Sequence, residues 1–192
     1  AAGCIRIFRE QADRKEIRRD FSSPLAPAMF QIRGIDNMQN DPEVEVVVYN
    51  SNDPIMADAR GGALRNASYD VDPTPRYQAR TRGKIVDGVL TTEPFDFVIH
   101  HKVAILDVVR DLRQARLRAT FKPDGSIEGN VYGYYTVESF WELLRQFTQN
   151  GADQSGIACP GLRKEVDRLA DGVRDPRTRK FTALSSAFYF HG

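Results

Sequence analysis

Alternating aromatic residues in the segment 131–135 are the first candidates for ligand binding in this sequence. If the segment is a strand, Tyr132 and Tyr134 lie on one face and Tyr135 on the other, because strand side chains alternate. Two tyrosines on one face would stack on a sugar or a base, and packing within the sheet is the alternative. Trp141, the only tryptophan, would join Tyr132 and Tyr134 if a pocket lies between the sheet and the following helix.

Two loops rich in aspartate and asparagine offer oxygen ligands for a hard cation. One loop holds Asp36, Asn40 and Asp41, and the other holds Asn52 and Asp53. Calcium binds carboxylate, amide and carbonyl oxygens in such loops. Neither loop has the spacing of an EF-hand, and the same residue types favour ordinary turns. Calcium is therefore the candidate cofactor, with plain turn structure as the competing interpretation.

The two cysteines, Cys4 and Cys159, bear on the compartment. A disulfide between them would close most of the chain into a loop. The chain-entropy model predicts that such a bond stabilises the folded protein by about 4–5 kcal/mol. Such bonds persist in oxidising compartments, so the pair predicts a periplasmic or extracellular location. There are two alternatives: Cys4 is an acylated, lipoprotein-like residue that attaches the protein to a membrane, or both thiols are reduced. The start without Met and the end at Gly192 favour a fragment of a longer chain.

The histidines form no catalytic constellation that the sequence can identify. His100 and His101 are adjacent, so in a strand they face opposite sides, and His191 is remote. A nucleophile pair of Cys159 with a histidine is the enzymatic alternative, and a bridged or buried cysteine is the simpler interpretation. The sequence lacks a phosphate-binding glycine loop, a Gly-x-Ser-x-Gly elbow and paired Cys-x-x-Cys motifs. Catalytic residues therefore stay unknown.

Composition excludes several classes of protein. The chain has 192 residues, with 27 basic and 26 acidic side chains and a net charge of +1. A balanced charge argues against general affinity for nucleic acid, which needs a surplus of cations. No apolar run approaches the roughly 20 residues of a membrane-spanning helix, so no transmembrane segment is expected. The length predicts a single domain over 1–192.

Three regions would hold the candidate side chains in place. Residues 1–30 predict an N-terminal helix followed by an extended connector containing prolines. Residues 43–135 predict a β-rich core, because β-branched and aromatic residues fall between turn signals. Residues 136–192 predict a helical C-terminal part that ends in a strand, although the last segment also fits a helix.

Turn and cap signals set the boundaries within these regions. Asp87-Gly88 and Asp124-Gly125 predict hairpin turns. Apolar residues at helical spacing predict helices over 137–149 and 160–171, the second of which would stop at Gly172.

The sequence thus predicts an α+β fold that is predominantly antiparallel. The sheet would be a sandwich or open barrel of about six to nine short strands, carrying an N-terminal helix and two C-terminal helices. Gly129 and Gly133 interrupt one predicted strand, which indicates tight curvature or close approach of a neighbouring backbone.

These patterns favour an exported, non-catalytic binding or structural module that binds a protein partner within a larger assembly. One alternative is a hydrolase-type enzyme whose site is dispersed in sequence, and another is a small-ligand carrier with an apolar pocket near Trp141. A module should expose an apolar patch or an unpaired sheet edge. An enzyme should show convergent acidic or histidine side chains in a pocket, and a carrier should show a deep apolar cavity.

Overall fold

The computed structural model describes residues 28–56, 58–59, 64, 66–103, 106–149 and 161–191. The predicted N-terminal helix lies outside these residues. Cys4 and Cys159 lie outside them as well, so the disulfide stays a prediction. Within the described part of the chain, no helix combines the length and the apolar character needed to cross a membrane.

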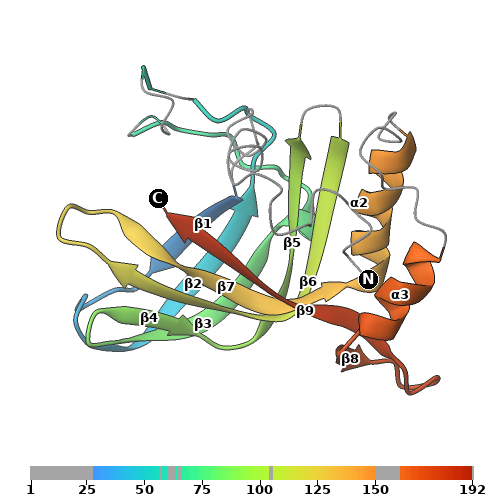
Figure 1. Cartoon of the computed structure of the whole chain (residues 1–192). Helices are drawn as coiled ribbons and strands as arrows, with labels where there is room; N and C mark the ends of the chain where they lie inside the picture. Colours follow the sequence, from blue (N-terminus) through green and yellow to red (C-terminus); the bar gives the residue numbers. More distant parts are fainter. Residues whose placement is uncertain are drawn as a thin grey trace.

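The described residues form one antiparallel sheet with helices at one end, which confirms the predicted α+β class (Figure 1). The order of hydrogen-bonded strands is β1-β2-β3-β4-β6-β7-β9-β8, and β5 pairs with β6. The strands are β1 (Ala28–Arg33), β2 (Asp41–Asn50), β3 (Ala79–Val86), β4 (Val89–Thr92), β5 (Phe95–Val103), β6 (Leu106–Phe121), β7 (Ile127–Thr136), β8 (Gly172–Arg174) and β9 (Phe181–His191). The helices are the 3-10 turn η3 (Pro75–Tyr77), α2 (Val137–Gln149) and α3 (Leu162–Leu169).

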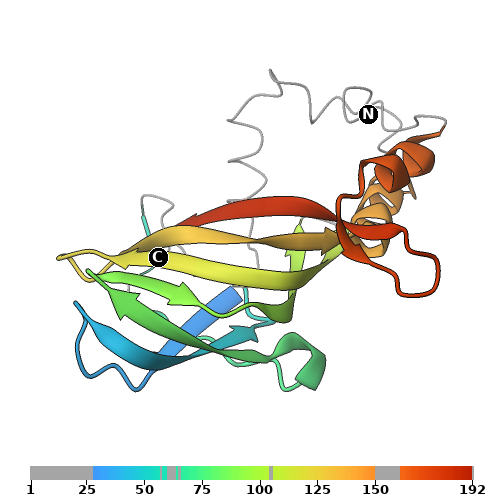
Figure 2. The ribbon, with the colours of Figure 1, turned by 90° about the horizontal axis from the view of Figure 1, so that it is seen from below.

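The sheet curves around an apolar interior. Figure 2 shows β1, β2 and β3 lying opposite β6, β7 and β9. The rings of Phe30 in β1 and Phe190 in β9 stack with centroids 5.5 Å apart, so the first and last long strands meet through their side chains. Val44, Leu90 and Leu117 are among the fully buried residues between them.

Two predicted hairpins are confirmed. Asp87 and Gly88 both have positive φ, +51° and +75°, which is the backbone of the tight turn that joins β3 to β4. Gly125 has φ +85° in the turn between β6 and β7. Glycine tolerates this conformation because it has no Cβ atom to clash.

The long strand β6 joins both parts of the sheet. Its first part pairs with β5, its last part pairs with β4, and β7 runs along the other side from Leu112 to Phe121. The pairing passes from β4 to β5 at Thr92, whose buried hydroxyl accepts the N–H of Leu117 at 2.9 Å. A bulge interrupts β6 at Gln114, which has φ +48°.

Gly129 and Gly133 let β7 approach β6 closely, as the sequence indicates. A Cβ atom on Gly129 would lie 2.8 Å from the Cα of Ala119, and one on Gly133 would lie 2.7 Å from the Cα of Ala115. Both distances are too short for a side chain, so these positions require glycine for space.

The two helices pack at the end of the sheet around a second, smaller core of Val137, Leu144, Leu162 and Val166. The helix α2 matches its predicted range, and the final segment is strand β9, as predicted. The prediction for the other helix is wrong at its C-terminal end, because α3 stops at Leu169 and Gly172 begins β8. The chain leaves the helix early because both oxygens of Asp171 bind Ser185 of β9, at 2.7 and 2.6 Å.

Candidate binding surface

The two tyrosines singled out in the sequence lie on the outer face of β7. Tyr132 is 39% exposed and Tyr134 is half-buried beside it. Tyr135 points to the opposite face, where it is buried and contacts the ring of Phe140 edge-on. The alternation expected for a strand therefore holds, and it leaves Tyr132 and Tyr134 together on the convex side of the curved sheet.

Cross-strand pairing places basic residues beside these tyrosines. Lys84 of β3 pairs with Thr91, Thr91 pairs with Arg118 of β6, Arg118 pairs with Asn130, and Asn130 pairs with Tyr189. Directly paired residues of an antiparallel sheet share a face, so this row runs across five strands of the outer side. At the usual strand spacing, the row spans about 19 Å.

A second row lies two residues along each strand. Arg116 of β6 pairs with Tyr132 of β7, which pairs with Ala187 of β9. We call the three cations of these rows, together with Tyr132 and its neighbour Tyr134 on β7, the outer basic–aromatic surface: Lys84, Arg116, Arg118, Tyr132 and Tyr134.

The cations of this surface are not neutralised by described neighbours. Among the residues that the structure describes, Lys84, Arg116 and Arg118 form no ion pair. Other arginines on the same face differ, since Arg80 pairs with Glu45 and Arg82 pairs with Glu43, each at 3.5 Å. The outer basic–aromatic surface therefore carries a local excess of positive charge on a chain whose total charge is nearly balanced.

An open cavity of about 610 Å³ lies against the tyrosines. It is lined by Pro94, Phe95, Asp96, Gln114, Arg116, Tyr132, Gly133, Tyr134, Ser185 and Ser186. Aromatic rings, hydrogen-bond donors and hydrogen-bond acceptors therefore converge at one place on the sheet. Such a combination is typical of sites that bind polar ligands.

The bulge in β6 shapes one wall of this cavity. Asp96 accepts the N–H of Gln114 at 2.8 Å with one oxygen, and the other oxygen receives Arg113 at 3.0 Å. Arg113 also bonds Asp111 at 2.8 Å, and its pKa is raised, chiefly by the hydrogen bond with Asp96. Asp96 is thus the carboxylate that holds the strained Gln114 in place beside the cavity.

Gly172 of β8 leaves space for the ring of Tyr134. A Cβ atom on Gly172 would lie 2.0 Å from the Cδ1 atom of Tyr134, so the tyrosine ring fills the space where a side chain would be. One part of the Tyr134 ring is therefore covered by β8, while Tyr132 stays the more exposed of the two.

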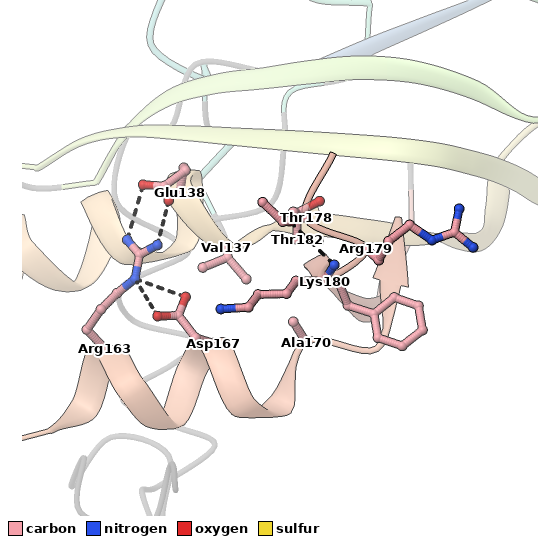
Figure 3. A pocket seen from close by; sticks show the side chains of 10 residues that line it. Val137, Glu138, Arg163, Asp167, Ala170, Thr178, Arg179, Lys180 and Thr182 are labelled. Atoms are coloured by element: carbon pink, nitrogen blue, oxygen red, sulfur yellow. Dashed lines mark hydrogen bonds and ion pairs between the residues drawn. The ribbon is translucent and has the colours of Figure 1, made fainter. Parts of the chain in front are cut away.

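A second cavity, of about 490 Å³, lies between α3 and the hairpin of β8 and β9 (Figure 3). Arg163 of α3 occupies one wall, where it bonds Glu138 of α2 at 2.5 and 3.1 Å and Asp167 at 3.1 Å. The hydrogen bonds with Arg163 lower the pKa of Glu138, and those with Glu138 raise the pKa of Arg163. Lys180 reaches across this cavity toward Asp167. The guanidinium of Arg163, the main cation of this cavity, is therefore already paired with carboxylates of the protein itself. We assign the cavity to the contact between the two helices and not to a binding site.

Trp141 lies apart from the two tyrosines. Its ring packs against the small core between α2 and α3, and the guanidinium of Arg163 lies 5.7 Å from the ring centroid. The structure therefore brings Tyr132 and Tyr134 together and places Trp141 in the helix interface.

The residues predicted to bind calcium are hydrogen-bonded to backbone groups, of their own loop in the case of Asp41 and of the β3–β4 turn in the case of Asn40. Asp41 accepts the N–H of Asp36 at 2.7 Å and the N–H of Glu43 at 3.1 Å, which lowers its pKa. Asn40 accepts the N–H of Asp87 at 3.2 Å. In the described chain, no group of three or more histidine, cysteine or acidic side chains is arranged to hold a metal ion. Calcium stays a prediction, which a thermal-unfolding shift on adding calcium chloride would test.

The second predicted calcium loop is arranged in the same way. Asn52 donates to Asp72 at 3.0 Å, and Asp53 accepts the N–H of Asp70 at 2.6 Å. These bonds reach residues 20 and 17 positions later in the sequence, so the two side chains tie two segments of the chain together and do not form a local turn.

No protein-family model, no curated protein and no solved structure matches the chain, so these comparisons assign it to no family.

Proposed function

We propose that this chain is an exported, non-catalytic binding module that holds an extended anionic ligand on its outer basic–aromatic surface. In this proposal the curved sheet is an open barrel, and β6, β7 and β9 form the wall that faces the ligand. The supporting observation is the direct pairing of Arg116 with Tyr132, an arginine without a carboxylate partner among described residues beside a partly exposed ring. Arginine suits this role because its planar guanidinium matches carboxylate and sulfate groups.

The hydrogen bonds that Asp96 already makes support binding rather than catalysis at this cavity. Asp96 is the one acidic residue among the lining residues, and each of its oxygens already accepts a hydrogen bond from Arg113 or Gln114. A general acid or base works best with a pKa near neutrality, which burial or a like charge would produce. Asp96 is instead about half exposed and forms an ion pair with Arg113.

The edge of β9 supports the further expectation of a larger assembly. Gly172 and Arg174 of β8 pair with β9 only at Ala183 and Phe181, and Asp171 covers the N–H of Ser185. From Ser186 onward, no second strand flanks β9 within the described part of the chain. An unpaired edge of this kind accepts a strand from a protein partner.

Titration with dextran sulfate, followed by isothermal calorimetry, tests the anionic-ligand proposal. The unmodified protein should bind this polyanion, and the double variant Arg116→Gln/Arg118→Gln should lose about tenfold in affinity or more, which corresponds to one weakened charge contact or several.

The matched control is Arg80→Gln/Arg82→Gln. It removes the same charge from the same face, but from arginines that Glu45 and Glu43 already neutralise. This control should bind like the unmodified protein. Equal losses in both double variants, or no binding to begin with, would overturn the proposal.

A further inference from the structure

We infer that the ligand of the outer basic–aromatic surface is an acidic oligosaccharide, with a sugar ring on Tyr132 and its carboxylate on Arg116. This inference rests on the proposed function and names its ligand class. Three observations carry it: the spacing of arginine and tyrosine, the acceptors inside the cavity, and the partial burial of the tyrosine rings.

The spacing fits a charged sugar. Arg116 and Tyr132 are direct cross-strand partners, so their Cβ atoms are about 5 Å apart. In a uronic acid the carboxylate is bonded to the ring itself. A ring that rests on Tyr132 therefore brings its carboxylate within reach of the Arg116 guanidinium. Arg118 lies one row further along β6, where it would meet the acid group of the next sugar.

The polar groups of the cavity suit hydroxyls. Sugar hydroxyls both donate and accept hydrogen bonds, so they need both kinds of partner. Gln114 and Arg116 offer donors, while Asp96 and the hydroxyl of Ser185 offer acceptors. Asp96 has lone pairs left beside those used by Arg113 and Gln114, since an ionised carboxylate has about four acceptor sites. A carboxylate at this point would repel the phosphates of a nucleic acid, whereas it attracts hydroxyl groups.

The tyrosine rings are poorly placed for nucleic-acid bases. Single-stranded nucleic acid stacks successive bases on several aromatic rings. Tyr134 is covered in part by Gly172, which leaves Tyr132, 39% exposed, as the accessible ring of the pair. One such ring suffices for the C–H side of a single sugar. The three unneutralised cations, Lys84, Arg116 and Arg118, are also few for a phosphate backbone, which carries a charge about every 3.4 Å per strand of a duplex.

Calorimetric titration with three probes tests the inference: oligogalacturonate, oligoglutamate with the same number of carboxylates, and oligothymidylate with the same number of phosphates. Oligogalacturonate should bind about tenfold tighter than either of the others. Tyr132→Ala should remove most of that difference, because it takes away the ring surface and leaves the arginines. Phe181→Ala is the matched control, since Phe181 has the same exposed fraction of 39% but lines the cavity beside α3 and not the one beside Tyr132, so its loss should leave the preference unchanged.

Thermal unfolding of both aromatic variants checks that they fold. Equal affinity for oligogalacturonate and oligoglutamate, tightest binding of oligothymidylate, or an unchanged preference in Tyr132→Ala would each overturn the inference. If dextran sulfate binding still depends on Arg116 and Arg118 in the same protein, the proposed function stands while the ligand class is wrong. If dextran sulfate binding does not depend on Arg116 and Arg118, the proposed function itself is wrong.

Discussion

Ser139 of α2 takes the place of a strand partner for Asp111 of β6. Its hydroxyl accepts the N–H of Asp111 at 3.1 Å and donates to the carbonyl of Val109 at 2.5 Å. Two turns later on the helix, Gln146 accepts the N–H of Asp107 at 3.0 Å. The edge of β6 that β7 leaves uncovered is therefore satisfied by helix side chains, which ties α2 to the sheet.

Replacing Ser139 by alanine should lower the free energy of unfolding by about 1–3 kcal/mol, because the N–H of Asp111 loses its partner and the carbonyl of Val109 keeps only the longer bond from Tyr135. Urea denaturation measures the loss. Ser126→Ala is the control, since that hydroxyl bonds only Asp124 in an exposed turn and its removal should cost about 0.5 kcal/mol or less. Equal effects in the two variants would contradict the role assigned to Ser139.

A buried asparagine makes the second prediction. Asn50 is 1% exposed, donates to the carbonyls of Tyr77 and Val98 at 2.8 Å each, and accepts the N–H of His100 at 2.8 Å. Asn50→Ala should lower the free energy of unfolding by about 3 kcal/mol or more, because three backbone groups lose their partner at once. Asn52→Ala, at an exposed position with one bond to Asp72, should cost far less in the same denaturation experiment.

The contact of Gly172 with Tyr134 predicts strong coupling between the two positions. Gly172→Ala should destabilise the protein and weaken ligand binding, because the new methyl group occupies the position of the tyrosine ring. Tyr134→Ala removes that ring, so the double variant should be more stable than the sum of the single effects implies. A double-mutant cycle measured by thermal unfolding tests this. Additive effects would show that the ring does not fill this space.

The pKa of Asp41 predicts how stability depends on pH. Hydrogen bonds from the backbone of Asp36 and Glu43 lower that pKa in the folded protein. The stabilisation is therefore present above the unfolded pKa and is lost as pH falls through the lower, folded value. Asp41→Asn should be less stable than the unmodified protein at neutral pH, and the difference should shrink below about pH 4. A difference that stays constant with pH would contradict this assignment.

Local signals in the sequence predict the hairpins and the alternation of the tyrosines well, because turn chemistry and side-chain alternation depend only on neighbours in the chain. Asp87-Gly88 has the positive φ angles that its turn requires, and Tyr132 lies on the face opposite to Tyr135, although alternation alone does not say which face is outward. The period-two pattern of Arg116 and Arg118 was also available in the sequence. It indicates that the two arginines share a face, although not which residues lie beside them.

Features that depend on contacts between residues far apart in the sequence cannot be predicted from such local signals. The row from Lys84 to Arg118 depends on the register of strands that pair across the sheet. Asn50 and Asn52 have the same side chain, yet only the fold determines that Asn50 is buried. Gly172 resembles a helix stop, but its role is to leave space for Tyr134. In each case the deciding partner lies far away in the sequence.

The position of β6 has a consequence for the dynamics of the whole sheet. From Leu112 to Thr120, apart from the bulge at Gln114, its backbone is flanked on both sides, by β5, Thr92 and β4 on one side and by β7 on the other. These amides cannot become accessible to solvent by fraying of an edge. Their hydrogen exchange with deuterium must instead await cooperative opening of the sheet, so this stretch should be the slowest-exchanging part of the described chain.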